Sequence, residues 1–245
     1  MNKIVLTGGG TAGHVYPAIA VKEELDKEFE FHYIGGKGME KDIISKFDDI
    51  KYHQISTVKL ERKFTFQNFL IPFKLLKSIN QSKKILKEIK PNIIFSKGGF
   101  VVPVVIAAHK LGIPIISHES DLSLGLANKI ILHYCKKMCV AFEKTEQYSS
   151  KCIYTGQPIR NNVLKGSKKK IKFENIDKTK PNLLIIGGST GAKFINEKVW
   201  INIDTLTKNF NVLHITGKQA KEIKHHKNYL QVPYAENIGD YLDFA

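Results

Sequence analysis

The stretch Gly8-Gly9-Gly10-Thr11-Ala12-Gly13-His14 decides the fold, because it directly follows the short apolar run Ile4-Val5-Leu6. Two further glycine-rich stretches also follow apolar runs: Lys97-Gly98-Gly99-Phe100 and Gly187-Gly188-Ser189-Thr190-Gly191-Ala192. A strand that ends in glycines and leads into a helix presents backbone N–H groups and a helix dipole to an anion, usually a phosphate. These first, second and third glycine turns therefore predict two wound α/β units that bind a phosphorylated ligand.

Apolar runs alternate with helical patterns along the chain, which is typical of βαβ units and a parallel sheet. We predict strands at 3–7, 30–34, 52–55, 92–96, 114–118, 137–141 and 151–154, and helices at 17–27, 40–47, 66–90, 101–111 and 124–134. A second unit is predicted to have strands at 182–186, 211–215 and 229–232, and helices at 192–206, at 218–225 and from residue 236 onward.

The periodic pattern disappears between Gly156 and Pro181, among several lysines, so we place a domain boundary there. We expect an N-terminal domain at 1–155, an interdomain linker at 156–181 and a partial second domain at 182–245. Three strands are about half of what a doubly wound domain normally contains. We therefore expect the second domain to be incomplete and the chain to be a fragment.

The composition indicates a globular protein with an anionic partner. The chain has 245 residues, 42% of them hydrophobic, and a formal net charge of +15. Such a charge favours nucleic acid, acidic lipid or a phosphorylated substrate, although a solvated basic surface would give the same count. No nucleic-acid recognition motif is present. His133, Cys135 and Cys139 match no common zinc spacing, so we expect no metal site and no cofactor.

The first glycine turn also fits the dinucleotide pattern G-x-G-x-x-G, through Gly8, Gly10 and Gly13. That pattern requires an acidic residue about 20 positions later, at the end of the second strand. The second strand here ends His32-Tyr33-Ile34-Gly35-Gly36, without an acid, which disfavours a nicotinamide or flavin oxidoreductase. His14 instead follows the turn at a helix N-terminus, where the dipole disfavours the imidazolium and favours a neutral base.

Five motifs, in order and at matching spacing over essentially the whole chain, resemble those of the MurG family of bacterial glycosyltransferases. They are the first glycine turn with Val15-Tyr16-Pro17-Ala18, the second glycine turn with Pro103, His118-Glu119-Ser120 with Asn128-Lys129, Gly156-Gln157-Pro158-Ile159-Arg160, and the third glycine turn. The resemblance implies a GT-B fold, with two Rossmann-like domains and the active site in the cleft between them. It implies transfer of N-acetylglucosamine from UDP-N-acetylglucosamine (UDP-GlcNAc) to the undecaprenyl-diphosphate-linked muramyl-pentapeptide, converting lipid I to lipid II.

The resemblance also implies roles for individual residues. Those that bind UDP-GlcNAc would be Thr11, Ala12, Gly13, Asn128, Arg160, Ser189 and, through its backbone, Ala235. The acceptor diphosphate would lie against the first two glycine turns, at Gly10, Gly98 and Gly99. His14 would be the general base that activates the muramyl C4 hydroxyl. Glu119 could instead orient His118 or cap a helix.

The implied mechanism is direct displacement with inversion, in which a helix N-terminus and Arg160 neutralise the leaving UDP without a metal. No Asp-x-Asp pair is present to bind a divalent cation. We expect residues 1–245 alone to turn over poorly, because the family pattern continues beyond Ala245. Another GT-B transferase that uses a UDP-sugar remains the nearest alternative.

The predicted helix 66–90 has an apolar stripe, Phe69, Phe73, Leu76 and Ile79, flanked by lysines that include Lys74. The pattern alone favours a stripe that faces the core. The resemblance favours a patch that docks on an anionic membrane, since the lipid acceptor stays in the bilayer. We therefore expect a peripheral protein at the cytoplasmic side of the cell membrane. Phe69→Ser and Phe73→Ser should weaken binding to vesicles more than they weaken folding.

Overall fold

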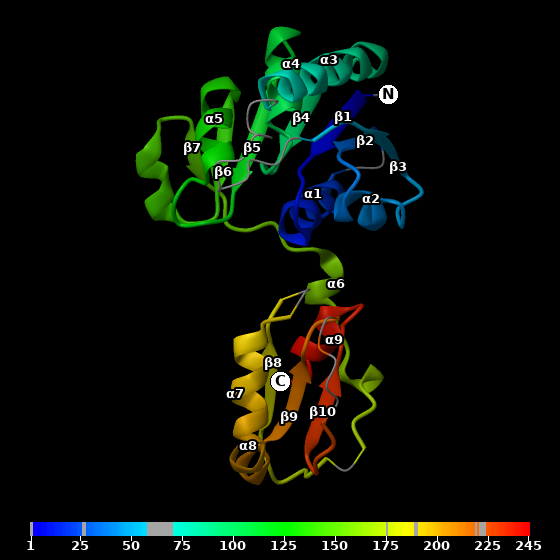
Figure 1. Ribbon diagram of the computed structural model, residues 1–245, viewed down its shortest axis with the longest axis vertical. Helices are drawn as coiled ribbons and strands as arrows, with labels where there is room; N and C mark the ends of the chain where they lie inside the picture. The colour runs from blue at the N-terminus through cyan, green and yellow to red at the C-terminus, as the bar shows by residue number, and fades with distance from the viewer. Residues whose placement is uncertain are drawn as a thin grey trace. The chain divides into compact units, whose positions relative to one another are not determined.

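A computed structural model describes residues 2–25, 28–57, 71–174, 176–188, 191–218, 220 and 224–245. The chain divides into two compact units, residues 1–160 and 161–245, which are described separately below. Figure 1 shows both units as wound α/β structures.

Unit 1 contains a parallel sheet of seven strands in the order β3-β2-β1-β4-β5-β6-β7. The strands are β1 (Asn2–Thr7), β2 (Phe29–Gly35), β3 (Ile50–Gln54), β4 (Ile93–Ser96), β5 (Ile115–Glu119), β6 (Lys137–Val140) and β7 (Cys152–Tyr154). The helices are α1 (Ala12–Glu24), α2 (Met39–Ile44), α3 (Ile71–Ile89), α4 (Val102–Lys110) and α5 (Leu126–Tyr134), and a 3-10 helix spans Glu143–Tyr148. All seven strands predicted for this unit are present.

Helices cover both faces of the unit 1 sheet (Figure 1). Side chains of β1 alternate between two cores: Ile4 and Leu6 pack with α1 and α2, whereas Val5 packs with α3, α4 and α5. A parallel sheet that is buried on both faces reads in the sequence as short, continuous apolar runs. This explains why the strand positions predicted from the apolar runs lie close to those in the structure.

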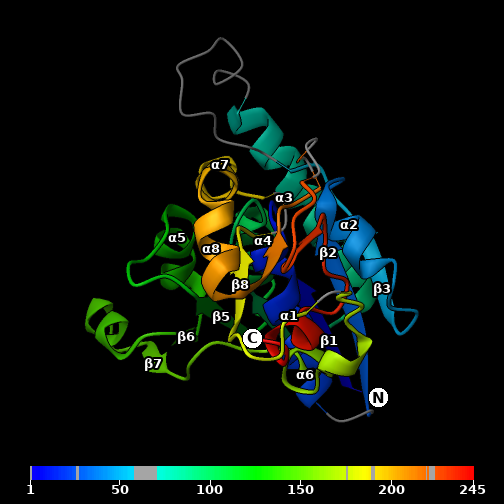
Figure 2. The same ribbon diagram turned by 90° about the horizontal axis from the view of Figure 1, so that it is seen from below.

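Unit 2 contains a three-stranded parallel sheet in the order β10-β9-β8. Its elements are α6 (Asn161–Leu164), a 3-10 turn at Lys168–Lys170, β8 (Asn182–Ile186), α7 (Lys193–Ile201), α8 (Ile203–Asn209), β9 (Asn211–Ile215), β10 (Tyr229–Val232) and α9 (Ile238–Leu242). Helices α7 and α8 pack on one face of the sheet, whereas α9 and side chains of residues 171–176 pack on the other. Figure 2 shows unit 2 from a second direction, with α6 beside α9 as in Figure 1.

The segment expected as a linker belongs largely to unit 2. Gly166 lies so close to Gly239 that a Cβ on Gly166 would be 1.9 Å from the Gly239 carbonyl carbon. The backbone N–H of Ser167 donates to the Asp240 carboxylate (2.7 Å), and the Phe173 and Phe244 rings are tilted against each other with their centroids 5.8 Å apart. The described part of this segment therefore packs with unit 2 instead of forming a free connection.

Three predicted helices differ from the structure. Helix α1 begins at Ala12, directly after the first glycine turn, and Pro17 lies inside it. The predicted helix 192–206 is two helices, because Asn202 leaves the helical conformation (φ −105°, ψ 17°) and its side chain bonds to the Lys198 carbonyl (2.8 Å). In the predicted helix 218–225, residues 218, 220, 224 and 225 are not helical, and the others lie outside the described residues.

Candidate functional site

The first two glycine turns meet at the point where the unit 1 sheet reverses its winding direction. The order β3-β2-β1-β4-β5 places this switch point between β1 and β4, the position where open α/β sheets bind ligands. Gly99 has a left-handed backbone (φ 82°), and a Cβ there would lie 2.2 Å from the Gly9 carbonyl oxygen. Gly10 is also left-handed (φ 99°) and packs against the Phe100 ring. Only glycine allows the two turns to approach this closely.

His14 lies in the first turn of α1, at the edge of this site. Its Nδ1 lies 2.9 Å from the Thr11 hydroxyl oxygen, and its backbone N–H donates to the Thr11 carbonyl (3.0 Å). Burial and the nearby Lys97 charge lower the pKa of His14, while Glu119, Asp121 and Glu40 oppose the shift. In the tautomer that donates Nδ1–H to the Thr11 hydroxyl, Nε2 keeps the lone pair that a general base needs.

Glu119 and Asn128 form a hydrogen-bonded group beside the second glycine turn. The Glu119 carboxylate accepts from the backbone N–H groups of Ser120 (2.8 Å), Asp121 (3.0 Å) and Gly125 (2.9 Å), and from Asn128 Nδ2 (3.0 Å). Burial acts to raise the pKa of Glu119, but these hydrogen bonds and Lys97 lower it overall. Gly125 directly precedes α5, so Glu119 holds the backbone that leads into that helix, although α5 has no side-chain cap.

Asn128 lies under the second glycine turn. Its amide donates to the His118 carbonyl (3.2 Å), and a Cβ on Gly98, which is left-handed (φ 81°), would lie 2.7 Å from Asn128 Oδ1. Asn128 is itself buried, with 5% of its surface exposed. The described contacts therefore assign Asn128 to support of the turn, whereas its predicted contact with the donor sugar remains a proposal.

Lys97 lies at the same site, although no role was predicted for it from the sequence. It follows β4, and only 3% of its surface is exposed. Burial lowers its pKa, and Glu119 and Asp121 act in the opposite direction. Its position directly after a strand and before two glycines could have indicated that Lys97 belongs to the site. Burial of its side chain could not be predicted, because it depends on contacts between distant segments.

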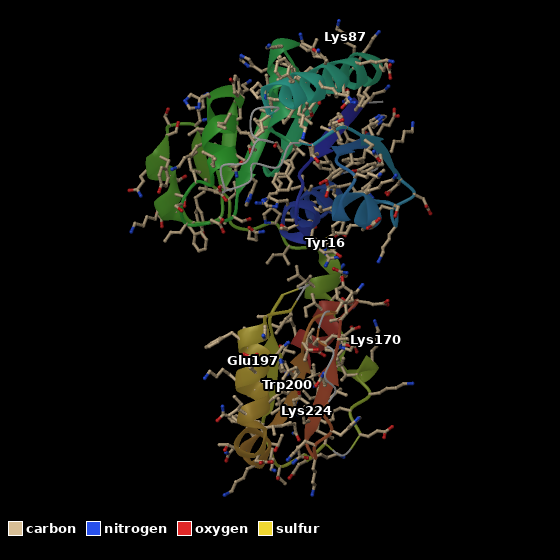
Figure 3. The ribbon with its side chains drawn as sticks, in the orientation of Figure 1. Tyr16, Lys87, Lys170, Glu197, Trp200 and Lys224 are labelled. Atoms are coloured by element: carbon tan, nitrogen blue, oxygen red, sulfur yellow. The ribbon has the colours of Figure 1, made fainter. Side chains whose placement is uncertain are left out.

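The segment that ends unit 1 crosses the same edge of the sheet. The Gly156 carbonyl lies 2.9 Å from His118 Nε2, and burial lowers the pKa of His118 to about 4. The Arg160 guanidinium lies 3.7 Å above the centre of the Tyr16 ring (Figure 3 labels Tyr16 on α1). A cation held over an aromatic face in this way has a defined position. Arg160 is therefore held against α1 at Tyr16, which lies five residues after Thr11.

The third glycine turn lies in unit 2, between β8 and α7. Gly188 and Gly191 are left-handed (φ 80° and 84°), and a Cβ on Gly191 would lie 2.1 Å from the Thr216 carbonyl oxygen at the end of β9. Ser189 and Thr190 lie outside the described residues. Ala235 is half-buried and packs with the cluster around Leu213, Ile215 and Phe244.

The predicted membrane stripe is only partly exposed. Phe73 and Leu76 are 70% and 57% exposed, and Lys74 is exposed beside them. Ile79, by contrast, is 6% exposed and packs in the core with Leu86 and Val104. The prediction that Ile79 belongs to the exposed patch is wrong, because α3 turns that side chain toward α4. Phe69 lies outside the described residues.

An apolar groove of about 430 Å³ adjoins the second glycine turn and the N-terminal end of α3. Its lining includes Ile71, Leu75, Gly99, Phe100, Leu126 and Ile130. Leu126, at the start of α5, is 65% exposed. None of the helices in the described part of the chain is long and apolar enough to cross a membrane. The described residues also contain no group of three or more His, Cys, Asp or Glu side chains suited to a metal ion.

The chain is similar to known glycosyltransferases in both units. The glycosyltransferase family 28 N-terminal domain matches residues 4–140, and the glycosyltransferase family 28 C-terminal domain matches residues 182–245. The structure is similar to that of Acinetobacter baumannii MurG, with a TM-score of 0.71 and 24% identity over 100% of this chain and 72% of that one. It is also similar to UDP-GlcNAc 2-epimerase from Neisseria meningitidis bound to UDP-GlcNAc, with a TM-score of 0.62 and 14% identity over 99% and 74%. These two likenesses establish the fold alone.

The two wound units and their glycine turns define a glycosyltransferase of the GT-B class. A Clostridium botulinum UDP-N-acetylglucosamine–N-acetylmuramyl-(pentapeptide) pyrophosphoryl-undecaprenol N-acetylglucosamine transferase is 49% identical over 99% of this chain and 71% of its own length. The Clostridium tetani transferase of the same name is 48% identical over 96% and 67%. The chain belongs to this transferase family, the MurG family.

Proposed function

We propose that the chain transfers N-acetylglucosamine from UDP-GlcNAc to a muramyl-pentapeptide that is linked through a diphosphate to undecaprenol. The observation that carries this proposal is the contact between the first two glycine turns beside His14, in a chain 49% identical to transferases named for this reaction. Two such turns at a sheet switch point suit the acceptor diphosphate. Unit 1 is then the acceptor domain, and unit 2 binds the UDP-sugar at the third glycine turn.

His14 is the proposed general base. Its Nε2 takes the proton of the muramyl C4 hydroxyl while the hydroxyl oxygen attacks the anomeric carbon of the donor, and UDP leaves from the opposite face. The configuration at the anomeric carbon is therefore inverted. Arg160 and the N-terminus of the helix after the third glycine turn offset the negative charge of the departing UDP.

Donor contacts are proposed for the remaining predicted residues. Thr11, Ala12 and Gly13 lie at the start of α1, and Arg160 is held over Tyr16 on the same helix. Asn128 would contact the donor sugar, Ser189 the donor phosphate, and the Ala235 backbone the uracil. These assignments rest on the family motifs and, for Thr11, Ala12, Gly13 and Arg160, on their position in unit 1.

Unit 1 is proposed to contact the cytoplasmic side of the cell membrane through Phe73 and Leu76. The two apolar side chains are exposed on α3, and Lys74 lies between them in the sequence. Further lysines follow on the helix, and Figure 3 shows Lys87 directed away from the sheet. Apolar insertion combined with lysines is the pattern of a surface that binds anionic lipid. The apolar groove beside Gly99 gives the lipid chain of the acceptor an apolar path from the second glycine turn.

The transfer assay tests the function directly. Radiolabelled UDP-GlcNAc is supplied with lipid I to this chain alone and to this chain joined to the part of the C. botulinum relative that it does not span. We expect labelled lipid II from the joined protein and little turnover from residues 1–245 alone. Label on a different acceptor, with lipid I left unchanged, would instead identify another GT-B transferase that uses UDP-GlcNAc.

A further inference from the structure

Lys97 is a largely buried cation at the carboxyl edge of the unit 1 sheet. Its side chain starts against the first glycine turn, since a Cβ on Gly8 would lie 3.1 Å from Lys97 Cβ. Within the described part of the chain, the Lys97 ammonium forms no hydrogen bond or ion pair. The Lys97 ammonium is not among the fully buried polar atoms that lack a partner, so it still reaches solvent at this edge of the sheet. A largely buried lysine whose charged end stays accessible is available to an anionic ligand.

Glu119 is the acid whose charge acts most strongly on Lys97, but it cannot serve as a hydrogen-bond partner. A carboxylate offers about four acceptor positions. Three backbone N–H groups and the Asn128 amide already occupy them at 2.8–3.0 Å. Glu119 therefore offsets part of the Lys97 charge at a distance and leaves the three N–H donors of Lys97 for another group.

The two glycine turns beside Lys97 also contain backbone donors. The N–H groups of Gly9, Gly10 and Gly99 make no hydrogen bond with any described residue. Gly9 and Gly99 are in contact, and the Lys97 charge acts on His14 and on His118. An ammonium and backbone N–H groups that are not engaged elsewhere are the groups that bind phosphate oxygens in proteins.

We propose that the Lys97 ammonium binds the diphosphate of an isoprenyl-diphosphate-linked acceptor, together with the N–H groups of the first two glycine turns. The proposal rests on the proposed function, which supplies that acceptor. Lys97 thereby positions the acceptor beside His14. It also keeps the His14 imidazole neutral, since a nearby positive charge disfavours the imidazolium.

The test measures diphosphate binding by the whole 245-residue chain, without any transfer reaction. Inorganic pyrophosphate, geranyl diphosphate and UDP are titrated into the wild type, Lys97→Met, Lys97→Arg and Lys110→Met. Lys110 is exposed on α4 and controls for the loss of one charge. Lys97→Met removes the charge of a largely buried side chain, so we expect it to fold and to unfold at the same temperature as the wild type or higher.

We expect Lys97→Met to bind pyrophosphate and geranyl diphosphate at least tenfold more weakly, while Lys110→Met binds like the wild type and Lys97→Arg retains part of the affinity. The pKa of His14, followed by NMR, should rise in Lys97→Met. Equal binding by Lys97→Met and the wild type would overturn the proposal, as would absence of binding to the wild type or a loss confined to UDP. Failure of transfer by the joined protein, in the wild type as well as in every variant, would refute the proposed function and leave this binding result intact.

Discussion

At the residue scale, His14 joins the glycine turn to the proposed chemistry. Thr11 Oγ1 lies 2.9 Å from Nδ1. This contact orients the ring and leaves Nε2 as the proposed basic atom. Burial and Lys97 both favour the neutral imidazole. A base with a lowered pKa stays active at a lower pH than an ordinary histidine, because protonation begins only further into the acid range.

This predicts the pH dependence of transfer. The acid limb of kcat/KM should fall below pH 6.5, the ordinary value for histidine, because the folded protein lowers the pKa of His14. The pKa of His14 itself, measured by NMR titration, should match that limb. Thr11→Val removes the contact with Nδ1 and should lower kcat about tenfold or more, with little change in the KM for the acceptor. An acid limb at or above pH 6.5 would contradict the assignment.

The sequence located His14 but could not locate the groups that tune it. The motif and the helix start lie within eight residues, so local patterns were sufficient to find them. Lys97 and Glu119 reach the same site only because β4 lies beside β1 in the sheet and β5 lies beside β4. The stacking of Arg160 on Tyr16 joins residues 144 positions apart, and no local pattern predicts such a contact.

At the scale of single elements, the second glycine turn depends on backbone contact. Gly99→Ala would place a Cβ 2.2 Å from the Gly9 carbonyl oxygen. Gly112 is a matched control, since it is also left-handed (φ 70°) but has nothing within 4 Å of the added Cβ. We expect Gly112→Ala to cost about 1–2 kcal/mol from backbone strain alone, and Gly99→Ala to cost clearly more in urea unfolding. An equal loss of unfolding free energy in Gly99→Ala and Gly112→Ala would mean that the two glycine turns can move apart without a cost in stability.

Helix α3 is expected to have one membrane-facing and one core-facing side. Phe73→Ser with Leu76→Ser should weaken binding to anionic vesicles and leave the melting temperature nearly unchanged, because both side chains are exposed. Ile79→Ser should do the reverse, with a loss of about 2–5 kcal/mol in unfolding free energy, since Ile79 lies in the core. Vesicle flotation and thermal unfolding separate the two effects. Parallel losses of binding and stability in the Phe73 and Leu76 variant would identify the stripe as core.

The periodicity of the sequence could not show which side chains of this α3 stripe are exposed and which face the core. Phe73, Leu76 and Ile79 are spaced three residues apart, so each lies within about 60° of the next around the helix. The packing of α4 and the sheet decides which of them is covered. The ten strands were easier to predict, because a buried parallel strand is a short apolar run bounded by glycine, proline or polar residues.

At the scale of the whole molecule, both units contain a buried neutral histidine. His118 in unit 1 and His214 in unit 2 each have a pKa lowered to about 4 by burial. His214 lies between Asn196 Oδ1 (3.1 Å) and the Tyr229 hydroxyl (2.9 Å), and the Trp200 indole N–H reaches the same hydroxyl (3.1 Å; Figure 3 labels Trp200). Both histidines therefore make folding sensitive to acid.

The sign of this sensitivity follows from proton binding. Between pH 6.5 and about 4 the unfolded chain binds protons at these histidines and the folded chain does not, so the unfolding free energy falls as the pH falls. The full effect is at most about 3 kcal/mol for each histidine. Urea unfolding at pH 7 and pH 4.5 should show the loss, and His214→Gln should show less of it. An unfolding free energy that is constant or rises toward pH 4.5 would contradict this prediction.

The central claim is that this chain carries a GlcNAc transferase site built on His14 between two glycine turns. The most direct measurement is single-turnover transfer of radiolabel from UDP-GlcNAc to lipid I by the protein joined to the remaining part of its C. botulinum relative. His14→Asn should lower the rate about 100-fold or more, whereas His133→Asn, a change at an exposed histidine of α5, should have no effect. Transfer at the wild-type rate by His14→Asn would contradict the account.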